Sequence, residues 1–161
     1  MIYEIKKYGN PILRKRSRRI TDINGEIKKL AENMLETMHA YNGIGLAAQQ
    51  IGRLECICVI DIPQETSGGK PIHIESDPPI KMPLVLINPL IEMKEDKVVL
   101  EEGCLSFPGI FTPVASASII VVKYYDLNGT ELKLKAGGLL ATAIQHEMDH
   151  LKGKLLVDRM S

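Results

Sequence analysis

The spacing of apolar residues predicts an amphipathic helix near the N-terminus. Apolar side chains recur there every three or four positions, at Ile27, Leu30, Met34, Met38 and Tyr41. This is the period of one face of an α-helix. Asn42-Gly43 follows, a pair typical of a helix end. We therefore expect a helix that ends near residues 42–43.

Shorter apolar runs predict strands at 55–62, 84–88, 98–100, 118–125 and 131–135. Asn128-Gly129 lies between the last two runs and is typical of a tight β-hairpin turn. Five of the nine prolines fall within residues 63–83, together with two adjacent glycines, so this segment is expected to be a loop.

A second helix is predicted after Gly137-Gly138, because Leu139, Leu140, Ala143 and Ile144 give it an apolar face. Gly153 is placed where a helix commonly ends. Strands and helices in this order predict an α+β fold, with mixed or antiparallel sheets around the second helix. At 161 residues and 45% hydrophobic content, the whole chain, 1–161, is expected to form a single compact domain.

The second helix carries the chemistry-bearing motif His-Glu-x-x-His, at His146, Glu147 and His150. Residues four apart lie on one face of a helix, so both imidazoles can bind one divalent cation while Glu147 reaches its water. Two of the four histidines in the chain form this pattern. A metal site is therefore favoured over two histidines that are merely buried or solvated.

A catalytic metal usually has three protein ligands and one position for water, so a third ligand is needed. The chain after His150 contains no glutamate, and the third histidine of the longer metalloprotease pattern would fall at Leu156. The missing ligand must therefore lie upstream. The candidates there are the three cysteines, His39, His73 and many carboxylates.

The local sequence separates these candidates. Cys56 and Cys58 alternate with apolar residues in a predicted buried strand, where cysteine behaves as a small apolar residue. His39 ends the first helix and His73 lies in the Pro-rich loop, so both are expected to be structural or solvated. Cys104 instead follows Gly103, which permits a close approach of the backbone. A thiolate at Cys104 would complete a Cys-His-His site.

Charge and composition exclude some partners. Twenty basic and twenty acidic residues cancel, so no overall field favours DNA or a membrane. The N-terminal segment is locally basic (Lys6, Lys7, Arg14, Lys15, Arg16, Arg18, Arg19), which would suit the ribosome near the exit tunnel, although a solvated face is the favoured interpretation. Three cysteines cannot all pair, and no run resembles a signal peptide or membrane span, so we expect a cytoplasmic protein. The sequence does not predict an oligomeric state.

Three blocks, in this order and spacing, resemble the peptide deformylases. They are Gly-Ile-Gly-Leu-Ala-Ala-Gln-Gln at 43–50, Glu-Gly-Cys-Leu-Ser at 102–106 and Gln-His-Glu-Met-Asp-His-Leu at 145–151, and residues 8–14 look like the family's N-terminal segment. The first block alone might suggest a nucleotide loop, but it lacks the third glycine of that fingerprint and follows a helix. The resemblance spans almost the whole chain.

The resemblance implies hydrolysis of the formyl group from an N-formyl-methionine peptide, with release of formate. Cys104, His146 and His150 would hold one divalent metal, natively Fe²⁺ and often replaceable by Zn²⁺, Ni²⁺ or Co²⁺. Glu147 would act as general base and then general acid.

The resemblance also implies roles for residues around the metal. The Gln50 side chain and the backbone N–H of Leu105 would stabilise negative charge on the tetrahedral intermediate. The residues expected to contact substrate come from all three blocks and their surroundings: Gly43, Ile44, Gly45, Leu100, Glu102, Gly103, Leu139 and Ala143. Of these, Ile44, Leu100, Leu139 and Ala143 are expected to line the methionine pocket.

Three departures from the family's usual pattern affect these expectations. Gln49 stands where many members carry proline, which could loosen the turn that presents Gln50. Residues 111–118 lack the arginines of many bacterial members, so Glu102 is expected to lack its usual ion-pair partner. The sequence ends at Ser161, which leaves little room for the C-terminal helix of many relatives.

Two other functions remain open from the sequence. A small metalloprotease or amidase could use the same metal and glutamate on an unformylated peptide bond. The three ligands could instead form a structural metal site, or the protein could only bind formyl peptides. Glu147 argues against a structural site, because such a site needs no general base.

Overall fold

The computed structural model describes residues 1–159. Two α-helices and six strands dominate, and three short 3₁₀ helices connect them. In chain order the elements are η1 (Pro11–Arg14), α1 (Gly25–Ala40), β1 (Gly45–Ala47), η2 (Ala48–Ile51), β2 (Ile57–Ile60), β3 (Ser76–Asp77), β4 (Leu84–Cys104), β5 (Phe107–Tyr125), β6 (Glu131–Gly137), α2 (Gly138–Leu151) and η3 (Leu156–Arg159). The α+β prediction is confirmed.

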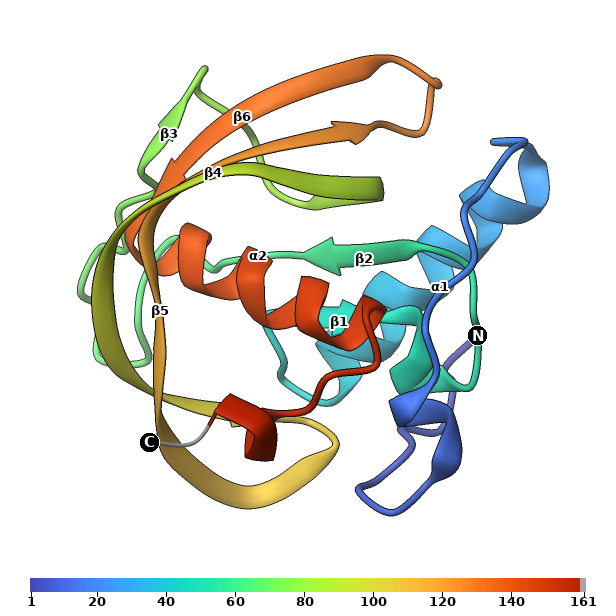
Figure 1. Cartoon of the computed structure of the whole chain (residues 1–161), viewed down its shortest axis with the longest axis horizontal. Helices are drawn as coiled ribbons and strands as arrows, with labels where there is room; N and C mark the ends of the chain where they lie inside the picture. Colours follow the sequence, from blue (N-terminus) through green and yellow to red (C-terminus); the bar gives the residue numbers. More distant parts are fainter. Residues whose placement is uncertain (160–161) are drawn as a thin grey trace.

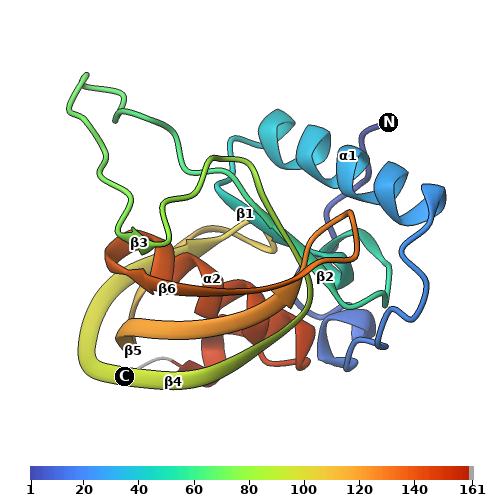
Figure 2. The same ribbon diagram turned by 90° about the horizontal axis from the view of Figure 1, so that it is seen from above.

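The six strands form one sheet in the order β1-β2-β4-β5-β6-β3, in which each pair is antiparallel. β4 and β5 make a long hairpin that curves around α2, so that α2 lies inside the curve (Figure 1). Seen from above in Figure 2, α1 lies on the other side of β1 and β2 from α2. The sheet therefore separates two hydrophobic layers.

Strand β2 shows why these layers form. Its four residues are all buried and alternate between the two sides, because successive side chains of a strand point to opposite faces. Ile57 and Val59 belong to the apolar cluster that contains the buried face of α1. Cys58 and Ile60 belong to the cluster under α2. Cys58 is thus a packed apolar residue, as the sequence predicts.

Both helices begin and end where their sequences indicate. Asn24 caps α1, because its side chain accepts hydrogen bonds from the backbone N–H groups of Glu26 and Ile27. α2 ends at Leu151, and Gly153 follows with φ of +74°. A Cβ at Gly153 would collide with the backbone carbonyl of Arg14, so glycine is also needed there for the close approach of the N-terminal segment.

The prediction 55–62 extends beyond β2, whereas the other predicted strands are too short. Strand β3 lies inside the segment 63–83 that was expected to be a loop. The runs 84–88 and 98–100 belong to the one strand β4, and β5 begins at residue 107 instead of 118. The intervening residues of β4 are mostly polar and half-exposed, so they show no apolar pattern, but β5 supplies hydrogen-bond partners along nearly their whole length. β1 was not predicted at all, since only three residues of the glycine-containing block pair with β2.

Candidate metal centre and active site

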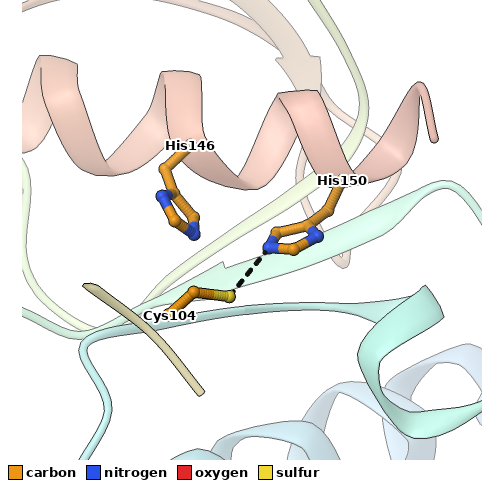
Figure 3. Close-up of side chains that lie close together, drawn as sticks. All are labelled: Cys104, His146 and His150. Carbon is orange, nitrogen blue, oxygen red and sulfur yellow. Dashed lines mark hydrogen bonds between the residues drawn. The ribbon is translucent and has the colours of Figure 1, made fainter. Parts of the chain in front are cut away.

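Cys104, His146 and His150 converge although they lie far apart in the sequence. The two histidines project from α2, and Cys104 is the last residue of β4. Their possible ligand atoms lie within 4.8 Å of one another. Figure 3 shows both rings turned toward the sulfur, and Nε2 of His150 is 3.3 Å from Sγ of Cys104. The predicted convergence of the three side chains is confirmed.

This geometry suits one divalent cation. A thiolate and an imidazole bound to zinc at about 2.3 and 2.0–2.1 Å in a tetrahedral site would be about 3.6 Å apart, close to the observed separation. Burial, and secondly the charge of His146, hold the pKa of His150 well below its usual range. The neutral imidazole thus favoured is the form that binds metals. The donor set of the site therefore fits a metal ion.

Glu102 orients one of the two imidazoles. A carboxylate oxygen of Glu102 lies 3.1 Å from Nδ1 of His146, and both side chains are nearly buried. A carboxylate on one ring nitrogen fixes the ring and makes the other nitrogen, here Nε2, a better metal ligand. Glu102 was predicted to contact substrate and to lack its usual arginine partner from residues 111–118. It lines the large cavity described below, and its partner is His146.

Glu147 lies beside the metal ligands in a buried position. Burial is the main cause that raises the pKa of Glu147 to about 7. Its Oε1 atom has no hydrogen-bond partner within residues 1–159. A Cβ at Gly45 would collide with the carboxylate of Glu147. Gly45 is therefore small for a reason that the sequence did not suggest: it makes room for this glutamate.

Gln50 is fixed in place by three contacts. Its Oε1 accepts a hydrogen bond from the backbone N–H of Ala47 at 3.0 Å. Its Nε2 group lies 3.3 Å from Oγ of Ser106 and 3.5 Å from Sγ of Cys104. The amide donor therefore faces the metal centre. Ser106 was not predicted as a site residue, although it belongs to the same sequence block as Cys104.

The turn that presents Gln50 is well packed despite the unusual Gln49. The side chain of Gln49 is completely buried, and its Nε2 donates to the backbone carbonyl of Lys15 at 3.2 Å. This hydrogen bond ties η2 to the N-terminal segment. The expected loosening of the turn is not seen; the glutamine instead provides a link that proline could not make.

A cavity of about 700 Å³ opens beside Glu147, Gln50 and Cys104. All the residues predicted to contact substrate line it: Gly43, Ile44, Gly45, Leu100, Glu102, Gly103, Leu139 and Ala143. Leu105 lines it as well. Tyr41, Ile110 and Phe111 also contribute to its walls. They were not predicted as site residues, because they are exposed and lie at element ends or in a strand longer than predicted.

Comparison with known proteins agrees with this geometry. A family model described as polypeptide deformylase matches residues 2–161. A peptide deformylase of Endomicrobium trichonymphae is 48% identical over 155 residues, which cover 96% of this chain and 84% of the relative. A peptide deformylase of Thermodesulfovibrio yellowstonii is 45% identical over 161 residues, covering 99% and 90%.

The chain belongs to the peptide deformylase family. Its activity is metal-dependent hydrolysis that removes the formyl group from N-formylmethionine. The crystal structure of peptide deformylase from Thermotoga maritima superimposes with a TM-score of 0.87 at 37% identity, covering 100% of this chain and 99% of that chain. A peptide deformylase from Synechococcus elongatus in complex with actinonin gives a TM-score of 0.86 at 40% identity, covering 99% and 79%.

Membership of the peptide deformylase family decides between the functions that the sequence left open. The metalloprotease, structural metal site and non-enzymatic binder are set aside in favour of the deformylase. No helix within the part of the chain that the structure describes is long and apolar enough to cross a membrane.

One ion pair near the site was not predicted. Arg159, in η3, donates two hydrogen bonds to the carboxylate of Asp149 in α2, at 2.8 and 2.9 Å. The pair joins the last described element to the helix that carries the metal ligands. The position of Asp149 inside the His-Glu-x-x-His motif was the only sequence signal for this ion pair. No spacing rule links Asp149 to Arg159.

Proposed function

We propose that each of the converging residues has a separate role in deformylation. Cys104, His146 and His150 bind one divalent cation, natively Fe²⁺, with Zn²⁺, Ni²⁺ or Co²⁺ able to replace it. Thiolate and imidazole donors suit all four of these metals. When bound there, such a cation would polarise the formyl carbonyl and lower the pKa of its bound water to about 7.

Glu147 is the general base and the subsequent general acid of this proposal. Its buried carboxylate, with the pKa raised to about 7, can accept a proton from the attacking water and return it to the leaving amine. Its unpartnered Oε1 atom leaves one acceptor free for that proton. The products are formate and a peptide with a free N-terminal amine.

Gln50 and Leu105 stabilise the developing negative charge. The Gln50 amide is held toward the metal centre by Ala47 and Ser106, so no reorientation is needed during the reaction. The backbone N–H of Leu105 follows directly after the ligand Cys104. Gly43, Ile44 and Gly45 on one side and Gly103 on the other line the cavity that receives the peptide.

The observation that carries the proposal is the position of Glu147. It lies in the same cavity as Cys104 and Gln50, beside a ligand set that fits a metal. The test is release of formate from formyl-Met-Ala by anaerobically prepared, metal-loaded protein and by Glu147→Ala. We expect Glu147→Ala to keep its metal and to lose about 100- to 10,000-fold in rate. Equal formate release by both proteins would refute the role of Glu147.

We also propose that residues 1–161 act as one catalytic domain in the cytoplasm. A thiol ligand must stay reduced to bind the metal, and all three cysteines are free. The ribosome near the exit tunnel is the proposed place of action, since most cationic residues of the N-terminal segment, Lys7 and the cations at 14–19, are exposed. Cosedimentation with ribosomes that disappears at high salt would support this, and binding unaffected by an Arg16→Gln/Arg19→Gln variant would argue against it.

A further inference from the structure

A second, smaller cavity lies on another side of the metal-bearing helix. Its volume is about 70 Å³, and its lining residues come from α2, the turn after α2, η3 and the β4–β5 hairpin. His146 and His150 both line it. It shares Glu102, Thr142 and His146 with the large cavity, so these three residues stand between the two spaces. The proposed mechanism places the peptide only in the large cavity.

Four cationic side chains line this small cavity: Lys94, Lys152, Lys154 and Arg159. They come from β4, from the turn after α2 and from η3. None of the three lysines takes part in an ion pair within residues 1–159.

The two carboxylates that line the cavity are already engaged. Asp149 is paired with Arg159, and Glu102 is paired with His146. Positive charge on the lysines is therefore not balanced inside the cavity by a free carboxylate of the described chain. An anion that entered the cavity would be attracted by these lysine side chains.

Two hydroxyl groups in the wall lack partners. Oγ1 of Thr142 and Oγ of Ser116 are buried and make no hydrogen bond to any residue between 1 and 159. Thr142 is 6% exposed. A buried hydroxyl without a partner destabilises the fold, so such groups usually meet water or a ligand. Two free donors beside uncompensated cations are what a small anion requires.

We propose that the small cavity is a subsite for the formate produced by the reaction. The inference rests on the deformylase function, because hydrolysis divides the formyl amide into a peptide amine and the formate anion. The amine stays in the large cavity with the rest of the peptide. Formate, which has three heavy atoms, is small enough for the volume behind His146 and carries the charge that the lysines attract. Product held there leaves the large cavity free for the next peptide.

The proposal predicts a distinctive pattern of product inhibition. Formate that competes with the peptide at the metal gives competitive inhibition, whereas formate in a separate cavity adds a component that high peptide concentration cannot overcome. The holoenzyme is assayed for amine release from formyl-Met-Ala over a range of sodium formate, with gluconate keeping the ionic strength constant. We expect a noncompetitive component for the unsubstituted protein.

Removal of charge at the cavity should weaken that component alone. We expect Lys94→Gln/Lys152→Gln to raise the inhibition constant of the noncompetitive formate component at least threefold. Without formate, kcat and KM should change less than twofold. The matched control is Lys97→Gln/Lys135→Gln, which removes two exposed lysines of β4 and β6 that do not line the cavity. The control should behave as the unsubstituted protein. Thr142→Val, which keeps the side-chain shape, should also weaken the noncompetitive component.

A binding measurement separates this inference from the enzymatic function. Saturation-transfer NMR of formate on the zinc-loaded proteins should give at least a twofold weaker signal for the cavity variant than for its control. Purely competitive inhibition, or equal inhibition and equal NMR signals in both double variants, would overturn the formate subsite while leaving deformylation intact. Absence of deformylation in every protein would instead refute the proposed function, and the NMR comparison would still decide whether formate binds.

Discussion

The large cavity has two contrasting regions, a polar floor and an apolar rim. The floor consists of Cys104, Gln50 and Glu147, and the latter two are at most 4% exposed. The rim consists of Leu100, Ile110 and Phe111 at the tip of the β4–β5 hairpin, and these side chains are 40–69% exposed. One cavity thus joins buried polar side chains with exposed apolar ones.

The difference lies in how each region is held. The floor draws on β4, η2 and α2, and its side chains are fixed by hydrogen bonds such as Gln50 to Ser106 and His146 to Glu102. The rim depends on one hairpin, where the ring of Phe111 lies over Gly103 and a Cβ at Gly103 would come within 2.7 Å of it. We infer that the floor sets the chemistry and that the rim contributes apolar area for the peptide.

Loss of the thiol ligand should have the largest effect. Cys104→Ala leaves two imidazoles, one short of the usual three protein ligands. We expect the variant to lose most of its metal, as measured by inductively coupled plasma mass spectrometry, and to fall below 0.1% of the activity, on the order of the 10³-fold or larger effects of losing central catalytic groups. Cys56→Ala is the control and should keep both its metal and its activity. Full metal content in Cys104→Ala would show that another residue is the ligand.

Replacement of the floor's amide should affect the rate without removing the metal. In Gln50→Leu the donor that faces the metal centre is lost, and loss of one such donor costs about 100- to 1,000-fold in kcat. Because the backbone N–H of Ala47 also loses its acceptor, we expect destabilisation of about 1–3 kcal/mol. Gln50→Glu, which keeps an acceptor for Ala47 but no amide donor, should not recover activity. Recovery of activity in Gln50→Glu would contradict the donor role.

The floor was far easier to predict from the sequence than the rim. His146, Glu147 and His150 are fixed relative to one another by helical spacing, and Cys104 was reached by elimination and by the family's second block. No comparable spacing rule or sequence block identifies the exposed residues of the rim. Phe111 contributes to the cavity because β4 and β5 extend far beyond their apolar runs, and that length comes from pairing between strands, which single-strand patterns do not report.

Two contacts around the metal centre were not predicted from the sequence, for a physical reason. Glu102 and His146 are 44 residues apart, and Asp149 and Arg159 meet only because η3 folds back onto α2. Such pairs depend on tertiary placement and leave no periodic pattern. Gly45 illustrates the same limit: its small size is required by the neighbouring Glu147 carboxylate, which no local turn rule could indicate.

Weakening the orientation of His146 should have an intermediate effect. Glu102→Gln keeps a hydrogen-bond acceptor for Nδ1 and removes the negative charge that strengthens the ligand. Changes of this kind cost about 10- to 100-fold in metal affinity or activity. The measurement is competition for zinc against a fluorescent chelator. Glu95→Gln, an exposed residue of the same strand, should leave affinity unchanged. Equal affinities in the two variants would mean that Glu102 does not support the metal centre.

The smallest effect is expected at the rim, and it should appear in substrate binding. Phe111→Ala removes an apolar ring from the edge of the cavity while the floor stays intact. If part of this ring is covered by the peptide, its loss is worth about 1 kcal/mol, or roughly a fivefold increase in KM. We expect kcat for formyl-Met-Ala to change less than twofold. Phe111→Leu should recover most of the loss, since it restores apolar area over Gly103. A fall in kcat comparable to that of Gln50→Leu would remove the distinction between floor and rim, because the ring would then be needed for the chemistry itself.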